Sequence, residues 1–105
     1  MAAYELAPAA ERDLEEIARY TIEVWGVARA RRYEAQLKRH FAAIGLARVR
    51  TRVFLKSRPE LLVSRCEHHY VFHLKREDRL PHILAVFHES MDLMSRLRKR
   101  LEIES

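Results

Sequence analysis

One histidine, His88, stands where a run of strand-forming residues ends, and it is the strongest candidate for acid–base chemistry. An unperturbed imidazole exchanges protons near neutral pH, so it can serve as a general acid or a general base. Cleavage of a phosphodiester also needs cations that stabilise the transition state, and Arg65 and Lys75 can supply them. The alternative is structural, with His88 hydrogen-bonded inside the turn at residues 90–92. Both interpretations stay open, and no catalytic residue is assigned.

A metal site is the second chemistry that the side chains suggest, because Cys66, His68, His69 and His73 are near neighbours. In one extended strand His69 and His73 share a face but lie about 13 Å apart, which is too far for one ion. The adjacent His68 and His69 point to opposite faces. We therefore expect no metal and no cofactor, and we expect Cys66 to be a small buried side chain.

Two groups of arginines are candidates for binding a partner. The first alternates with apolar and neutral residues over 48–53, so an extended chain projects its guanidinium groups from one side. These groups can bind phosphates or an acidic protein segment, or they can simply face water. The second group lies toward the end of the last predicted helix. The predicted partner-binding residues are Arg48, Arg50, Arg52, Arg96, Arg98 and Arg100.

The elements that position these side chains begin with a predicted β-hairpin. Residues 66–75 and 82–92 are rich in strand formers, and residues 76–81 predict a loop of about four to six residues between them. Along the first strand, Tyr70, Phe72 and Leu74 fall on one face, while Val71 and His73 fall on the other. The second strand is apolar from residue 83 to residue 87, which is typical of a central strand covered on both faces.

A helical hairpin is predicted before these strands. A short strand over residues 4–7 leads to Pro8, which suits the first turn of a helix. That helix is acidic in its first half and ends at Gly26, and a second helix runs from Val27 to about Ile44. So short a link makes the two helices antiparallel neighbours. We expect Trp25 to pack in the core at this corner.

The remaining segments complete a single domain over residues 1–105. Residues 46–59 predict an irregular or partly extended connector, residues 61–63 a strand, and residues 93–101 a helix capped by Ser90 or Asp92. The order predicts an α+β fold: an N-terminal strand, then an antiparallel helical hairpin packed on one face of a small, mainly antiparallel sheet (β-α-α-β-β-β), and a short C-terminal helix.

Composition and charge narrow the class of protein. The single cysteine excludes an internal disulfide and fits a reducing compartment. Neither a signal peptide nor an apolar stretch of membrane-spanning length is visible, so we expect a cytoplasmic protein that does not enter the membrane. Residues 1–45 carry seven basic and seven acidic side chains, whereas residues 46–105 carry thirteen basic and eight acidic, a net charge of +5. A basic half favours acidic partners.

Four sequence segments, taken together, resemble the ParE branch of the RelE/ParE toxin superfamily. Residues 4–17, YELAPAAERDLEEI, resemble its opening strand, proline step and acidic helix, and residues 20–26, YTIEVWG, resemble its helix end. Residues 69–73, HYVFH, and residues 86–92, VFHESMD, resemble its last two strands. The segments occur in family order. The chain departs from the family between residues 46 and 56, which are arginine-rich instead of Pro/Gly-rich, and at residues 67–68, where Gly-Ser is usual.

The resemblance implies the toxin of a type II toxin–antitoxin system, neutralised by a cognate, ParD-like antitoxin. ParE-like members are associated with inhibition of DNA gyrase and not with an enzymatic activity of their own. The alternative is a RelE-like, ribosome-dependent mRNA endonuclease that uses His88, Arg65 and Lys75. Such nucleases commonly use a tyrosine near the C-terminus, and no tyrosine follows Tyr70, so ParE-like action is favoured. Direct binding to nucleic acid stays open.

Overall fold

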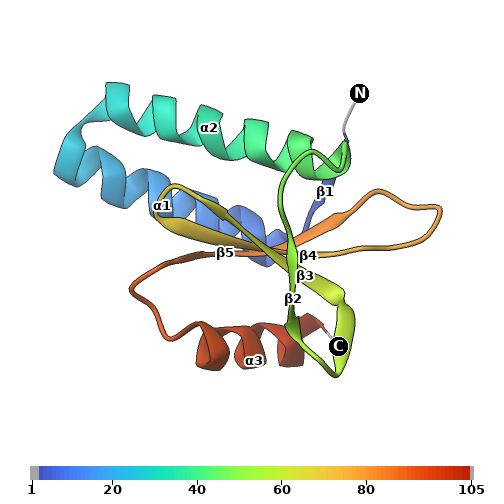
Figure 1. Ribbon diagram of the computed structural model, residues 1–105. Coiled ribbons are helices and arrows are strands. Elements are labelled where there is room, and N and C mark those ends of the chain that lie inside the picture. The colour runs from blue at the N-terminus through green and yellow to red at the C-terminus, as the bar shows by residue number, and fades with distance from the viewer. Residues whose placement is uncertain (1–2, 105) are drawn as a thin grey trace.

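The computed structural model describes residues 3–104, which fold into three layers (Figure 1). The α1–α2 helical hairpin covers one face of a five-stranded sheet, and α3 covers the other face. The sheet order is β1-β5-β4-β3-β2, with β1 parallel to β5 and the remaining pairs antiparallel. The predicted α+β fold is thus confirmed. In chain order the elements are β1 Glu5–Leu6, α1 Pro8–Trp25, α2 Val27–Gly45, β2 Arg52–Leu55, β3 Arg58–Cys66, β4 His69–Leu74, β5 His82–His88 and α3 Leu93–Glu104.

The helical hairpin forms as the sequence predicts. Pro8 occupies the first turn of α1, where its missing N–H costs nothing. Gly26 separates the two helices with a φ of 91°, a conformation that favours glycine, and its N–H bonds the carbonyl of Ile22. Leu37 and Phe41 of α2 are buried, and they pack in one core cluster with β4 and β5. The hairpin is therefore held to the sheet by its apolar stripe.

The central strands divide the core into two clusters. Along β4, Val71 packs under the hairpin while Phe72 packs under α3, so the predicted alternation is confirmed. The run from Ile83 to Phe87 in β5 is buried throughout, as expected of a strand covered on both faces. Leu97 of α3 is buried in the second cluster. Asp92 begins α3, because its carboxylate accepts a hydrogen bond from the N–H of Ser95 at 3.2 Å.

The connector over residues 46–59 was predicted wrongly in part, because it contains the strand β2. Val53 lies opposite Leu62 of β3, and the register shifts before Leu55. An edge strand often carries charged side chains. Here the arginines at positions 48, 50 and 52 make the strand formers at residues 53–55 difficult to recognise in the sequence. The sheet therefore has one strand more than the predicted order, and β3 begins at Arg58 instead of near residue 61.

The strand predicted over residues 66–75 is also broken. The chain turns at Glu67 and His68, so Cys66 ends β3 and pairs with His69 at the start of β4. Glu67 has a φ of 53°, in the left-handed region that tight turns use. The loop between β4 and β5 spans residues 75–81, slightly longer than predicted. Because of the turn at residues 67–68, the end of β3, the start of β4 and the end of β5 lie together at one end of the sheet.

An ion pair closes the outer side of β5, which the two-residue strand β1 leaves open. Arg100 of α3 binds both carboxylate oxygens of Asp13 in α1, at 2.8 and 2.9 Å, and their side chains are only 13% and 12% exposed. Arg100 also donates to the carbonyl of Leu84 at 2.9 Å, and the N–H of Val86 donates to Asp13 at 2.9 Å. Two side chains thus take the place of a neighbouring strand and tie α1, β5 and α3 together.

Removal of this carboxylate should destabilise the fold strongly. Asp13→Ala leaves the Arg100 charge buried without its partner, and we expect a loss of about 3–5 kcal/mol of unfolding free energy. Glu34→Ala is the matched control, since Glu34 forms an exposed pair with Lys38 and should cost about 0.5 kcal/mol or less. Urea denaturation of both variants measures the difference. Equal losses in the two variants would contradict this role for Asp13.

Candidate functional site

A cleft of about 850 Å³ lies beside the outer edge of β5, between the helical hairpin and α3. Side chains of α1 and α2 form one wall, the C-terminal half of β5 and the turn between β3 and β4 form the floor, and α3 forms the other wall. The Asp13–Arg100 pair lies among the lining residues. All three helices therefore contribute to one concave surface, and it is the best-formed candidate site among the described residues.

Aromatic side chains are exposed at the mouth of the cleft. Trp25 is 58% exposed and Tyr20 is 63% exposed, and both line the cleft. The prediction that Trp25 packs in the core is wrong, because the tip of the hairpin projects beyond the sheet (Figure 1) and leaves this side chain exposed. Arg29 lies over the Trp25 ring at 4.4 Å from its centre. The mouth thus presents large apolar surfaces and a cation to an incoming molecule.

His88 is held inside its own turn. Its Nδ1 accepts a hydrogen bond from the N–H of Ser90 at 3.0 Å and lies 2.7 Å from the Ser90 hydroxyl. An Nδ1 that accepts these bonds carries no proton, so the ring is the neutral tautomer with its proton on Nε2. This geometry agrees with the structural alternative for His88, and it leaves Nε2 as the nitrogen available to the cleft.

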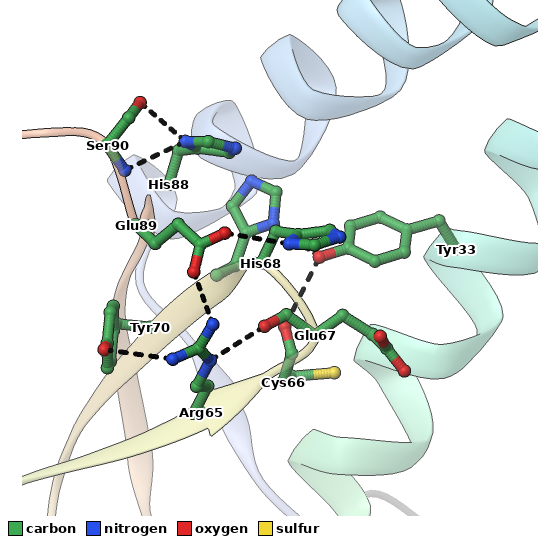
Figure 2. Close-up of polar contacts among 10 residues, drawn as sticks. Tyr33, Arg65, Cys66, Glu67, His68, Tyr70, His88, Glu89 and Ser90 are labelled. Carbon is green, nitrogen blue, oxygen red and sulfur yellow. Dashed lines mark hydrogen bonds and ion pairs between the residues drawn. The ribbon is translucent and has the colours of Figure 1, made fainter.

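A second polar cluster joins the β3–β4 turn to the end of β5 (Figure 2). Glu89 receives Arg65 on one carboxylate oxygen and the Nδ1–H of His68 on the other, the latter at 2.8 Å. The hydrogen bond from His68 lowers the pKa of Glu89, and the charge of Arg65 lowers it further. Glu89 is therefore a carboxylate at neutral pH, and it orients the exposed His68 ring as carboxylates orient imidazoles in acid–base sites.

The three residues of the nuclease hypothesis do not come together. Arg65 lies near His88, but its charge is paired with Glu89. Lys75 follows the end of β4 that is remote from His88, where its N–H bonds the carbonyl of Glu60. His88 pairs with His69, at the opposite end of the same strand. Lys75 therefore cannot act on a group that His88 contacts.

A pair made of the partly buried Tyr33 and the buried His69 lies at this floor and joins α2 to β4. The Tyr33 hydroxyl is 2.5 Å from Nδ1 of His69, which is 8% exposed, and it also approaches the Cys66 carbonyl at 3.3 Å. Burial raises the pKa of Tyr33 to about 12. Burial lowers the pKa of His69 to about 4, and the rings of His88 and His68 lower it further when they are protonated. Both side chains are thus neutral near pH 7, and the pair supports the floor of the cleft.

The predicted partner-binding arginines occupy two separate regions. Arg48, Arg50 and Arg52 are exposed beside β2, the edge strand farthest from β5 in the sheet order. On α3, Arg96 and Arg98 are exposed, and Arg96 lines the cleft. Arg100 lines it too, but its charge already belongs to Asp13. Of the six predicted arginines, only Arg96 and Arg100 therefore line the cleft.

Between residues 3 and 104, no group of three or more His, Cys, Asp or Glu side chains is placed to hold a metal ion. None of the helices described in that range is long and apolar enough to cross a membrane.

Sequence reasoning did not select four residues that shape the site: Asp13, Tyr33, Glu89 and, as an exposed side chain, Trp25. Tyr33 sits on the apolar stripe of α2 and Asp13 in the acidic first half of α1, so each pattern has a simpler explanation. Their partners lie 36 and 87 residues away in the chain. The one available signal was Trp25 beside a helix-breaking glycine, where a large side chain has few neighbours.

Comparison with known proteins agrees, along most of the chain, with the family that the four sequence segments resemble. The family described as the ParE toxin of the type II toxin-antitoxin system, parDE, matches residues 4–93. A curated relative, "Toxin ParE" of Escherichia coli, is 43% identical over 102 residues, which cover 97% of this chain and 99% of the relative. The family match includes α1, α2, the whole sheet and the β5–α3 turn, so it spans the elements that build the cleft except α3.

The buried histidines should make the fold sensitive to acid. His73 is 4% exposed, its Nδ1 has no hydrogen-bond partner, and burial, with the nearby charge of His40, lowers its pKa to about 4. Burial also lowers the pKa of His69 to about 4. In the unfolded chain these rings bind protons below their ordinary pKa of 6.5, whereas in the folded chain they stay neutral down to about pH 4. The two rings therefore contribute their full stabilisation above pH 6.5, and the free energy of unfolding falls as the pH drops from 6.5 to about 4.

Each of these two shifts corresponds to on the order of 3 kcal/mol. Urea denaturation between about pH 7.5 and pH 4 should therefore show a steep loss of stability, and His73→Phe should reduce the slope. Val53→Ala, at an exposed side chain that does not titrate, is the control and should keep the slope of the parent chain. An unchanged slope in His73→Phe would contradict the assignment.

Proposed function

The chain belongs to the ParE toxin family of type II toxin–antitoxin systems, and from this membership we propose that it arrests growth by inhibiting DNA gyrase and is neutralised by a cognate antitoxin. Gyrase is the target that the resemblance to ParE implies. Inhibition then rests on binding and needs no catalytic residue. If gyrase is the target, the protein acts in the cytoplasm.

One observation carries the preference for inhibition over RNA cleavage. The cations of the nuclease hypothesis are unavailable at His88, since Arg65 is paired with Glu89 and Lys75 lies at the other end of the sheet. An enzyme that cleaves RNA needs positive groups aimed at the charge that develops on the scissile phosphate. The exposed apolar mouth of the cleft instead suits a protein surface, because aromatic anchors dominate the energetics of protein interfaces.

A second candidate function, a ribosome-dependent endonuclease, has one specific observation in its favour. His68 is oriented by Glu89 and lies across the floor from His88, so two imidazoles face the same cleft. A pair of this kind can act as general base and general acid. Arg96 and Lys99, on the α3 wall, are the cations that this candidate would have to use.

Expression of the chain without its antitoxin separates the two functions. Gyrase inhibition should stop growth with filamentation and DNA-damage signalling, and co-expression of the antitoxin encoded beside it should restore growth. His88→Ala should keep this toxicity, because His88 serves its own turn. New 5′ ends within codons of cellular messages that disappear in His88→Ala would contradict the proposal and support the nuclease. Unimpeded growth with confirmed soluble protein would contradict both.

The arginines beside β2 should steer an acidic antitoxin segment. Exposed charges attract an oppositely charged partner over a distance, so they mainly set the association rate and its dependence on salt. Replacement of Arg48, Arg50 and Arg52 together by Ser should therefore slow association at low salt by about tenfold and change dissociation less. Surface-based kinetics at two ionic strengths measures both rates. If the association rate and its salt dependence stay unchanged, these arginines face another molecule, either gyrase or a nucleic acid.

A further inference from the structure

The positive charge of the chain is concentrated on α2 and on the connector that follows it. Residues 27–52 carry eight basic side chains and one acidic side chain, a net charge of +7. The rest of the chain carries twelve basic and fourteen acidic side chains, a net charge of −2. The one carboxylate of this segment, on Glu34, is paired with Lys38. The segment therefore presents a strongly positive surface to anions in solution.

Two of these arginines lie on the outer side of α2, away from the sheet. Arg32 and Arg39 line a hollow with Ala35 and Gln36, and these four positions share one face of the helix. The buried Leu37 lies on the opposite face. Both arginines are exposed, and among the described residues neither takes part in an ion pair or a hydrogen bond. Their guanidinium groups are therefore available to a partner.

The row of arginines continues past the end of α2. Arg39 follows Arg32 by seven residues, a rise of about 10 Å along the helix axis at 1.5 Å per residue. The N–H of Arg48 bonds the carbonyl of Ala43 at 2.8 Å, which fixes this exposed arginine at the last turn of the helix, about 6 Å farther along. Three exposed arginines thus follow one another over about 16 Å, the length of about five base pairs at 3.4 Å each.

The surface around this row lacks the side chains that other partners would require. Leu46 is the one large apolar side chain exposed between residues 31 and 52 of the described chain, whereas protein interfaces depend on clusters of apolar anchors. The aromatic rings of the segment are engaged, since Tyr33 contacts His69 and Phe41 is buried, so none can stack on an unpaired base. What remains is a row of guanidinium groups, whose geometry matches phosphate oxygens.

We propose that Arg32, Arg39 and Arg48 bind the phosphate backbone of double-stranded DNA without reading its sequence. An exposed helix face can lie against the wide major groove of B-form DNA, whereas the major groove of A-form RNA is too deep and narrow for it. This binding goes beyond gyrase inhibition and does not depend on it. Arg48 also belongs to the group that we expect to steer the antitoxin, so the test uses Arg32 and Arg39 alone.

The dependence of binding on salt counts the phosphate contacts. The full chain, freed from its antitoxin in denaturant and refolded, is titrated into a fluorescent duplex of about 20 base pairs between about 50 and 200 mM salt, and anisotropy reports binding. Three contacts predict a slope of log K against log salt of about −2.7. Arg32→Gln/Arg39→Gln should weaken binding at least about tenfold and reduce the slope to about −0.9. An unchanged slope would overturn the proposal.

Arg12→Gln/Arg19→Gln is the matched control. These arginines are exposed, lie seven residues apart on α1 and have no ion-pair partner among the described residues, but they stand among the acidic side chains of that helix. This variant loses the same charge and should keep the slope of the parent chain, as should the charge-conserving Arg32→Lys/Arg39→Lys. Equal losses of slope in the two glutamine variants would overturn the proposal, because binding would then follow the overall charge.

Competitors separate duplex DNA from other anions. Polyglutamate that displaces the duplex at an equal concentration of charge would assign the row to an acidic protein segment and overturn the proposal. Tighter binding of a single strand, or of an RNA duplex of the same length, would overturn it too. Gyrase and antitoxin are absent from these titrations. A chain that arrests growth but does not bind the duplex therefore contradicts the DNA site and leaves the proposed function intact.

Discussion

The contact between Asp13 and Arg100 is the constraint on which the arrangement of the molecule depends. Strand β1 covers only the first two residues of β5, and a buried strand edge without partners is costly. Asp13 and Arg100 satisfy the next two backbone groups and neutralise each other in a nearly dry environment. Because one residue comes from α1 and the other from α3, the same contact fixes the two helices on opposite faces of the sheet. The distance between the cleft walls follows from it.

The cleft and the features of a binding protein follow from this arrangement. The ion pair lies among the residues that line the space between the hairpin and α3, and so do the exposed side chains of Tyr20 and Trp25. The histidines around its floor are engaged with neighbours: His88 with Ser90, His69 with Tyr33 and His68 with Glu89. Each of these contacts joins two elements or stabilises a turn. The exposed surfaces that remain are the aromatic mouth and the basic wall of α3, which suit the recognition of a protein segment.

Local patterns in the sequence predicted the elements that local physics determines. The apolar stripe of α2, Pro8 and Gly26 define the helical hairpin, and alternation in β4 assigns Val71 and Phe72 to opposite faces of the sheet. The edge strand β2 is hidden in the sequence because a row of arginines, Arg48, Arg50 and Arg52, leads into it, and the turn at Glu67 is hidden because no glycine marks it. The site was the least predictable part. Asp13 looked like a helix-dipole residue and Arg100 like a surface cation, and nothing local reveals a bond between residues 87 positions apart.

A double-mutant cycle on this pair tests the central claim most directly. Asp13→Ala, Arg100→Ala and the double variant are compared with the parent chain by urea denaturation near pH 7. A pair that closes the β5 edge together should give a coupling free energy of about 2–3 kcal/mol, because either single change removes most of what the double change removes. Additive effects, with a coupling below about 0.5 kcal/mol, would show that the two side chains act independently. The account of the edge, and of the cleft that depends on it, would then be contradicted.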